Sequence, residues 1–543
     1  MSNAFYHTPK TVNEPLLGYG KGSPEKLALK KALADAKSKQ MDIPMYIGGK
    51  HVSTPNKVAI HPPHELKHIL GHYSKGTKEH AEQAIAAAMN AKKAWEDMAW
   101  QDRAAIFLKA ADLLAGPYRA RMMAATMLCQ SKNAYQAEID CIAELADFWR
   151  FNVQFLTDIY NQQPNSSTGV WNRTEYRALE GFIFALTPFN FTAIAGNLPA
   201  APALCGNVAV WKPAESQIYS ACVIMDILEE AGLPAGVINL IYVDGSTAGE
   251  AIFSHRDFAG LHFTGSTTTF NRLWQTIAMN LPKYKSYPRI VGETGGKDFV
   301  MVHPSANAKA VATALGRGAF EFQGQKCSAA SRAYIPQSLW NDVKNYLVED
   351  VKSMKMGTTE DFTNFVNAVI DEKAFDKISS YIVDAKTAKD ADIIVGGNFS
   401  KAEGYFIEPT VIVVDTPQYT TMCEEIFGPV LTIYVYADND FEKTLDILDA
   451  TSPYALTGSI FSTDRAAVAV ATDKLRHAAG NFYINDKPTG AVVGQQPFGG
   501  ARLSGTNDKA GSALNLYRWL SARTIKETFV SPSDYRYPFL EEK

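Results

Sequence analysis

The chain has 543 residues, of which 46% are hydrophobic and 20% are charged. This length is too great for one hydrophobic core and predicts several domain-sized units of an ordinary globular protein. Lys and Arg number 53 against 57 Asp and Glu, the formal net charge is −4, and no long basic run occurs. We therefore exclude nucleic acid as a partner. No apolar run approaches the roughly 20 residues that span a bilayer, so we expect no membrane partner.

Cysteine and histidine usage limits the chemistry further. The six cysteines form no C-x-x-C pair and no disulfide-framework spacing, which is typical of a reducing compartment. The 11 histidines include no H-E-x-x-H motif, so we expect no metal site. The N-terminal residues lack the apolar core of a signal peptide. These features predict a cytoplasmic protein if the source is bacterial, or a mitochondrial matrix protein if the chain is a processed eukaryotic enzyme.

The first third of the chain is predicted to be mainly helical. Residues 1–164 contain an N-terminal arm and packing helices, since the apolar residues of 102–114 recur at helical spacing. Residues 165–180 mix turn formers with β-prone residues and predict a hairpin that stands off the body. We expect this hairpin to serve oligomerisation.

Residues 181–293 predict a parallel sheet with helices on both faces. Short apolar strands are expected at 181–186, 208–212, 237–243 and 260–263, with a helix at 217–231. Continuous apolar strands that alternate with helices are typical of the doubly wound fold, which binds nucleotides at the carboxyl ends of its strands. No G-x-G-x-x-G motif follows a strand, so a dinucleotide would bind here in a non-standard way.

A second α/β region is predicted at 294–494. Helices are expected at 338–354, 441–450 and 464–476, and strands at 406–414 and 430–436. The last segment, 495–543, returns along the molecule and ends in a strand within 516–529. We expect that strand to pair with another subunit.

Cys327 lies in the sequence Phe320-Glu-Phe-Gln-Gly-Gln-Lys-Cys-Ser-Ala-Ala-Ser-Arg332. A structural cysteine usually lies in an apolar run, whereas a nucleophile needs close backbone approach and an environment that tolerates its thiolate. Gly324 and Ser328 favour the nucleophile. Four further motifs accompany it: Pro188-Phe-Asn190, Gly292-Glu-Thr-Gly-Gly-Lys297, Glu425-Ile-Phe-Gly-Pro-Val430 and Pro497-Phe-Gly-Gly-Ala-Arg502.

With these five motifs in this order, the chain resembles the NAD(P)-dependent aldehyde dehydrogenase superfamily over nearly its whole length. The resemblance implies an NAD-binding Rossmann-type domain, an α/β catalytic domain, a β-hairpin oligomerisation element and a homodimer. It assigns Cys327 as the nucleophile, Asn190 as an oxyanion donor and Glu293 as the base that hydrolyses the thioester. Without the family, Asn190 is equally consistent with a helix N-cap and Glu293 with a solvated loop carboxylate.

The resemblance also implies where NAD binds. It places Lys212 and Glu215 on the adenosine ribose and Glu425 and Phe427 at the nicotinamide ribose and ring. Around the pyrophosphate it places Gly245, Gly249, Gly265 and Ser266. We expect NAD to be preferred over NADP, because Glu215 repels a 2′-phosphate. One departure is Phe270, where many family members have glycine.

Within the superfamily the chain is similar to the branch that oxidises L-glutamate γ-semialdehyde, formed from 1-pyrroline-5-carboxylate in proline breakdown. The signatures are Gly324-Gln-Lys-Cys-Ser-Ala329, Thr187-Pro-Phe-Asn-Phe-Thr-Ala-Ile194 and residues 484–502. This resemblance implies the following substrate-binding residues: Ser328, Gly490 and Ala491 on the carboxylate, Phe191 and Phe498 on the aliphatic segment, and Thr187. The two phenylalanines are also consistent with core packing. Alternatives are another substrate such as succinate semialdehyde, or a catalytically silent relative.

Overall fold

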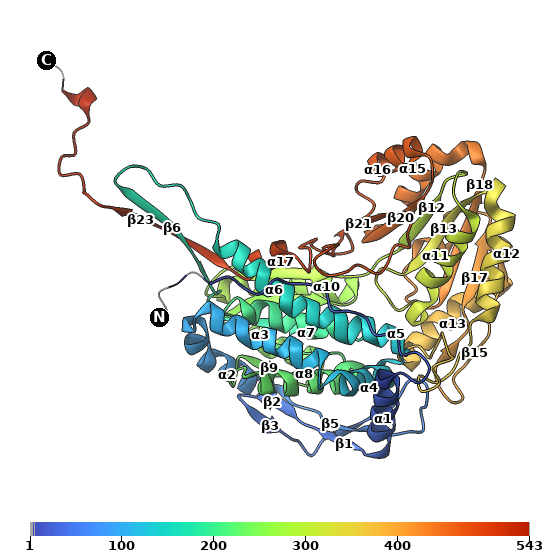
Figure 1. The fold of residues 1–543 in the computed structure, drawn as a ribbon, viewed down its shortest axis with the longest axis horizontal. Coiled ribbons are helices and arrows are strands. Elements are labelled where there is room, and N and C mark those ends of the chain that lie inside the picture. The colour runs from blue at the N-terminus through green and yellow to red at the C-terminus, as the bar shows by residue number, and fades with distance from the viewer. Residues whose placement is uncertain (1–3, 5, 542–543) are drawn as a thin grey trace.

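The chain folds into two α/β lobes and an extended arm (Figure 1). The computed structural model describes residue 4 and residues 6–541. Each lobe is built on a seven-stranded sheet. Within the described residues, no helix combines the length and the apolar character needed to cross a membrane. The predicted alternation of strands and helices in two α/β units is confirmed.

The sheet of the first lobe has the order β11-β10-β7-β8-β9-β2-β3. Its strands are β2 (Met45–Ile47), β3 (Lys50–Val52), β7 (Phe182–Leu186), β8 (Val208–Lys212), β9 (Ile238–Leu240), β10 (Phe258–Thr264) and β11 (Arg289–Glu293). The strands from β7 to β11 run parallel, and β2 and β3 extend one edge in antiparallel orientation. The sequence pattern predicts β7 to β10. The edge strands, with 3 residues each, are too short to show an alternation.

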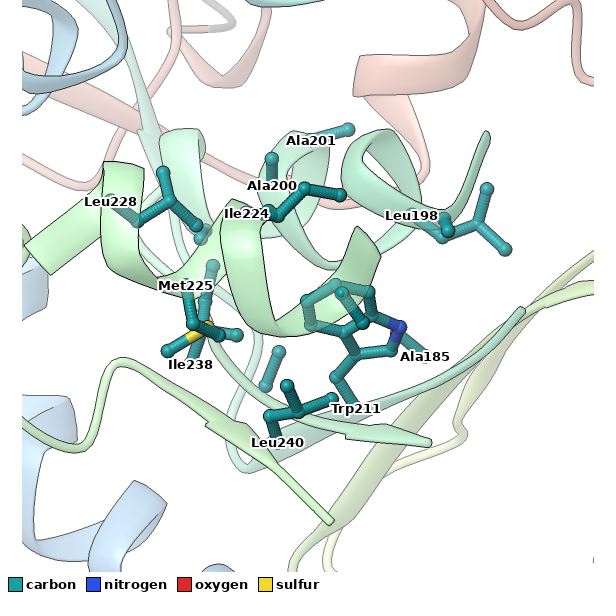
Figure 2. Close-up of a cluster of buried hydrophobic side chains, with 14 of the residues drawn as sticks. Ala185, Leu198, Ala200, Ala201, Trp211, Ile224, Met225, Leu228, Ile238 and Leu240 are labelled. Carbon is teal, nitrogen blue, oxygen red and sulfur yellow. The ribbon is translucent and has the colours of Figure 1, made fainter. Parts of the chain in front are cut away.

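Helices cover both faces of this sheet, as the almost complete burial of β8 requires. Figure 2 shows Trp211 of β8 enclosed by side chains of neighbouring elements, among them Leu198, Ile224 and Leu240. The helices are α2 (Lys78–Asp97), α3 (Trp100–Ala115), α4 (Arg119–Gln130), α6 (Leu145–Tyr160), α7 (Thr192–Leu204), α8 (Ile218–Ala231), α9 (Gly245–Phe253) and α10 (Thr267–Asn280). The carboxyl ends of the parallel strands thus form one edge of a covered sheet, the usual place for a nucleotide.

The sheet of the second lobe has the order β14-β17-β18-β13-β12-β20-β21 and is parallel except for β14. The strands of this sheet are β12 (Asp298–Val302), β13 (Ala330–Pro336), β14 (Ala391–Val395), β17 (Thr410–Val414), β18 (Val430–Tyr436), β20 (Thr457–Phe461) and β21 (Asn481–Ile484). The helices of the lobe are α11 (Ala308–Phe320), α12 (Gln337–Ser353), α13 (Glu372–Thr387), α15 (Phe441–Thr451) and α16 (Arg465–Lys474). Alternate residues of β12 pack into different hydrophobic cores. Phe299 and Met301 belong to one core, and Val300 and Val302 belong to the other. The strand predicted at 406–414 is divided into β16 (Phe406–Ile407) and β17, since Pro409 has no N–H for a ladder.

The arm departs from the expected hairpin. Residues 165–180 hold a single strand, β6 (Val170–Arg177), which pairs antiparallel with β23 (Ser521–Thr528) along its whole length. Figure 1 shows this two-stranded ribbon pointing away from both lobes. The C-terminal strand thus pairs along one edge with β6 of its own chain. An eight-residue strand leaves too little of the segment for a turn and a second strand.

Shorter elements connect these parts. At the N-terminus, α1 (Pro24–Ser38) precedes a three-stranded sheet of β1 (Met41–Ile43), β4 (Lys57–Ile60) and β5 (Gly71–Ser74). A π-helical segment, η1 (Glu138–Glu144), joins α5 (Ala134–Ala137) to α6. The remaining elements are η2 (Glu215–Gln217), η3 (Leu281–Lys283), η4 (Glu321–Gly324), β15 (Phe399–Ser400), α14 (Thr420–Cys423), η5 (Asp438–Asp440), β19 (Tyr454–Ala455), β22 (Ala501–Arg502), α17 (Ala513–Tyr517) and η6 (Pro538–Leu540).

Candidate active site

Cys327 lies in a tightly held turn between α11 and β13, which we call the nucleophile loop (residues 320–329). Phe322, Gln323 and Gly324 adopt left-handed backbone conformations, with φ of 50°, 55° and 65°. Two non-glycine residues in this region are strained, and such strain persists only where the surroundings fix it. The Gln323 amide does so, because its Nε2 donates to the carbonyls of Ser131 and Ala368 at 2.9 and 2.8 Å.

Glycines bring three of the sequence motifs into contact. A Cβ on Gly296 would lie 2.2 Å from the carbonyl oxygen of Cys327, and a Cβ on Gly324 would lie 2.2 Å from that of Gly428. The Gly296 N–H also donates to Glu425 Oε1 at 2.9 Å. No side chain fits at these glycines, so the backbones approach closely. The motifs at 292–297, 324–329 and 425–430 therefore meet at one place.

The environment of the Cys327 thiol disfavours its ionised form. The side chain is half-buried. Burial raises the pKa of Cys327 well above its ordinary value, and the neighbouring Asp298, Glu293 and Glu425 raise it further. The polar sequence around Cys327 led us to expect a setting that tolerates the thiolate. The raised pKa departs from that expectation. Lys326, the cation adjacent in sequence, pairs with Glu321 at 3.1 Å.

Glu293 ends β11 with its carboxylate enclosed. Its Oε2 is buried and has no hydrogen-bond partner among the described residues. Burial raises the pKa of Glu293 well above its ordinary value, Lys509 lowers it and Asp508 raises it. The Lys509 ammonium is held beside it, donating to the carbonyls of Gly480 and Gly499, each at 2.8 Å. A solvated loop carboxylate would have neither property.

Asn190 is directed at the nucleophile loop. Its side chain is buried, and Nδ2 donates to the carbonyl of Gln325 at 3.1 Å. It does not cap α7, because the Asp140 carboxylate accepts from the N–H groups of Thr192 and Ala193 at 3.0 and 2.9 Å. The N-cap interpretation of Asn190 is therefore wrong.

The predicted cofactor residues of the first lobe lie at the carboxyl edge of its sheet. Lys212 ends β8 and Glu215 begins η2 directly after it. Gly245 begins α9 at an exposed position, where a Cβ would meet nothing within 4 Å. Ser266 N-caps α10, accepting from the N–H of Thr269 at 3.2 Å. An open glycine and a capped helix start fit a pyrophosphate.

Other predicted cofactor residues are placed less uniformly. Gly249 lies inside α9, where a Cβ would contact the Phe253 ring at 3.5 Å. Gly265 follows β10, and its N–H donates to the Glu293 carbonyl at 3.1 Å. Phe427, with a φ of 63°, makes an edge-to-face contact with Phe189.

The Phe270 departure has a packing explanation. A Cβ on Gly292 would lie 2.2 Å from Phe270 Cζ. The ring also stacks on Phe263 with centroids 5.4 Å apart. Phe270 thus fills the space above Gly292, the residue before Glu293, and this close fit requires glycine at that position.

The predicted substrate residues converge on the segment 489–496, which we call the substrate loop. Ser328 Oγ and Thr489 Oγ1 form a hydrogen bond of 2.8 Å, which joins the residue after Cys327 to this loop. Gly490 is exposed and has a φ of 97°, a conformation that favours glycine. Ala491 follows it, and Phe498 pairs with Ala510 just beyond the loop.

Two other predicted substrate residues are engaged by the protein itself. The Lys132 ammonium lies 4.2 Å from the ring centroid of Phe191 and 4.4 Å from that of Phe322. Thr187 is buried, and its hydroxyl accepts from the indole N–H of Trp211 at 3.0 Å. Thr187 therefore joins β7 to β8, and the structure does not bring it to the substrate loop.

Sequence reasoning missed several charged residues around Cys327. The buried ion pair of Lys132 and Asp140, at 2.6 Å, lies beneath Phe191. Burial raises the pKa of Glu144, at the end of η1, to about 8, and Asp140 raises it while Lys132 lowers it. Lys326 could have been identified from the sequence, since it directly precedes Cys327. Glu144 could not, because only tertiary folding brings η1 to the nucleophile.

A cysteine, a carboxylate and an amide converging beside a nucleotide-binding edge are characteristic of aldehyde oxidation. The model of the aldehyde dehydrogenase family matches residues 51–525, and the chain belongs to this family. The delta-1-pyrroline-5-carboxylate dehydrogenases of Dictyostelium discoideum and Homo sapiens are similar, with 54% and 46% identity, over 98% of this chain and 96% and 95% of theirs. Both are named mitochondrial. The crystal structure of the Mycobacterium tuberculosis enzyme bound with NAD matches with a TM-score of 0.96 and 50% identity, covering 100% of both chains. The family resemblance predicted from the motifs is confirmed.

Proposed function

We propose that this protein catalyses the NAD-dependent oxidation of L-glutamate γ-semialdehyde to L-glutamate, the step of proline catabolism that follows 1-pyrroline-5-carboxylate. The observation that carries this proposal is the Ser328–Thr489 hydrogen bond, which joins the nucleophile loop to the exposed substrate loop. Relatives over nearly the whole length carry the name delta-1-pyrroline-5-carboxylate dehydrogenase. A general aldehyde dehydrogenase needs no such carboxylate anchor beside its cysteine.

In this proposal, the Cys327 sulfur adds to the aldehyde carbon and its proton leaves to solvent. The alkoxide oxygen accepts hydrogen bonds from the Asn190 amide and the Cys327 N–H. The raised basicity of Glu293 suits the later proton transfer from water, because a base works best when its pKa lies near the working pH. Lys212, Glu215, Gly245, Ser266, Glu425 and Phe427 hold NAD, which supplies a hydride acceptor when bound.

Hydrolysis of the Cys327 thioester completes the reaction. Glu293 takes a proton from water, the hydroxide oxygen bonds to the acyl carbon, and the Cys327 sulfur leaves as the thiolate that recovers the proton. Its buried, unpartnered Oε2 is the atom available to that water.

Different residues bind the two parts of the substrate. Ser328 and the N–H groups of Gly490 and Ala491 take the α-carboxylate. Phe191 and Phe498 flank the carbon chain. The Lys132 ammonium under Phe191 fixes that ring in place.

We also propose an assembly and a compartment. The β6–β23 ribbon, which projects from the body (Figure 1), would be the oligomerisation element of a homodimer. Residues 181–293 would form the NAD-binding domain and 294–494 the catalytic domain. For a eukaryotic source we propose the mitochondrial matrix, since the two relatives are named mitochondrial, and for a bacterial source the cytoplasm.

NADH formation with a panel of aldehydes tests the proposal. We expect L-glutamate γ-semialdehyde to be oxidised with a higher kcat/KM than succinate semialdehyde or pentanal, and NAD to be used in preference to NADP. A preference for succinate semialdehyde would replace the substrate assignment. No NADH with any aldehyde would identify a catalytically silent relative.

A further inference from the structure

Residues 13–19 form an extended segment that we call the N-terminal strap. The strap is hydrogen-bonded to η1, through Glu138 near the strap's end, and to α6, through Asp147 near its start. Between them, Glu14 forms ion pairs with Arg119 and Arg150. The reaction proposed above uses no residue of the strap.

One end of the strap is fixed by Asn13, whose side chain makes three hydrogen bonds. Its Nδ2 donates to Asp147 Oδ2 at 2.7 Å and to the carbonyl of Val493 at 2.8 Å. Its Oδ1 accepts from Gln495 Nε2 at 2.9 Å. The Glu14 N–H adds a bond to Asp147 Oδ1 at 2.7 Å. Asn13 therefore joins α6 to the substrate loop.

The other end is fixed at Glu138, which is fully buried. Tyr19 Oη donates to Glu138 Oε2 at 2.6 Å, and the Leu17 N–H donates to Oε1 at 3.0 Å. Arg119 Nη2 completes the site at 2.7 Å. A buried carboxylate without these partners would be costly, so this end of the strap stabilises the fold. Among the described residues, this end of the strap makes no hydrogen bond to the substrate loop.

The substrate loop needs an external support of this kind. Gly490 and Gly494 have φ values of 97° and 81°, and glycines in such conformations leave a loop many alternatives. A Cβ on Gly494 would lie 2.3 Å from the Phe151 ring, so the loop rests directly on α6. Besides the Ser328–Thr489 bond at its start, Asn13 supplies the side-chain bonds from outside the loop.

We propose that the N-terminal strap holds the substrate loop in its binding conformation, with Asn13 as a positioning residue for the carboxylate anchor. This inference rests on the substrate assignment of the proposed function. Its physical basis is that a preformed anchor need not be ordered when the substrate binds. The strap thereby couples a segment at the chain's beginning to substrate selection.

Asn13→Ala tests the strap, with Tyr19→Phe as the matched control at its other end. We expect Asn13→Ala to lower kcat/KM for L-glutamate γ-semialdehyde about tenfold, mainly through KM, and to change the value for pentanal less than about twofold. Tyr19→Phe should lower the Tm and leave the ratio of the two kcat/KM values unchanged. Equal losses for both aldehydes in Asn13→Ala would overturn the proposal, as would the same ratio change in Tyr19→Phe.

Hydrogen exchange separates the strap from the substrate assignment. In Asn13→Ala without substrate, amides of residues 489–496 should exchange about tenfold faster than in the wild type, but not in Tyr19→Phe. The double variant Asn13→Asp/Asp147→Asn restores a hydrogen bond between the side chains at 13 and 147, but residue 13 then has no donor for the Val493 carbonyl. Amides of its substrate loop should therefore also exchange faster than in the wild type. Unchanged exchange in both variants overturns the strap. Faster exchange in an enzyme without a preference for the semialdehyde would overturn the substrate assignment instead.

Discussion

The nucleophile loop and the substrate loop lie side by side but are held in different ways. Every residue of the nucleophile loop except Cys327 is buried. Its glutamines bond to distant backbone, since Gln325 Oε1 also accepts from the Ile370 N–H at 2.9 Å. The substrate loop is exposed at Gly490, Val492, Gly494 and Gln495, and few side chains secure it.

This difference separates chemistry from selection. A nucleophile must stay within a few tenths of an ångström of its productive position, and an overdetermined loop provides that. Because few contacts hold the substrate loop, its carboxylate-binding groups can change without moving Cys327. Damage to the first loop should therefore affect all aldehydes, and damage to the second only those with a carboxylate.

Cys327→Ala gives the largest expected effect. We expect aldehyde oxidation to fall at least about a thousandfold for every aldehyde, because no other group can form the covalent intermediate. NAD affinity, measured by titration calorimetry, should stay within about twofold of the wild type. Residual NADH formation at a tenth of the normal rate would show that a different residue is the nucleophile.

Glu293→Gln should separate the two half-reactions. Without the carboxylate, thioester hydrolysis should slow about a hundredfold. Because the Cys327 proton leaves to solvent, stopped-flow measurement should still show a burst of NADH near one equivalent per active site, followed by slow turnover. Turnover at the wild-type rate would remove Glu293 from the mechanism. This variant acts alike on charged and uncharged aldehydes, which sharpens the contrast with the substrate loop.

Much of this organisation can be predicted from the sequence. The apolar strands β7, β8 and β10 and the helix α8 follow from continuous apolar runs and helical spacing. The residues that converge at the site, Cys327, Asn190 and Glu293, can be named through the family motifs. Local composition alone left each of them with a structural alternative.

Features that depend on distant contacts cannot be predicted in this way. The β6–β23 pairing joins segments that lie far apart in the sequence, so the local pattern suggested a hairpin. The bond of Thr187 to Trp211 and the approach of Glu144 to Cys327 arise only after the sheet and η1 have packed. The raised pKa of Cys327 likewise reflects burial and assembled carboxylates, against a polar local sequence.

Ser328→Ala is a smaller and more selective change. A hydroxyl that bonds a carboxylate should contribute about tenfold to a hundredfold in kcat/KM. We expect that loss for L-glutamate γ-semialdehyde and a change of less than about threefold for pentanal. Thr489→Val removes the hydroxyl partner of Ser328 while keeping the side chain's shape, and should give a weaker version of the same preference. Equal losses for the two aldehydes would make Ser328 a support for Cys327.

The smallest expected effect is a shift in pH dependence on replacing Lys509. The charged groups that act on Glu293 are the ammonium of Lys509 and the carboxylate of Asp508. Burial raises the pKa of Glu293 and Lys509 lowers it, so Lys509→Met should raise the pKa further. Thioester hydrolysis requires the ionised carboxylate and rises as the pH passes through this pKa. Its midpoint should therefore move to higher pH, by about one unit.

Lys509→Arg is the control for this shift, since it keeps the positive charge. Lys509 also donates to the carbonyls of Gly480 and Gly499, so both variants should lose some thermal stability. Only Lys509→Met should move the midpoint of the steady-state rate in a pH–rate profile. A midpoint that shifts equally in both variants would mean that Lys509 acts by holding the glycines. In that case burial, and not the charge of Lys509, would set the pKa of Glu293.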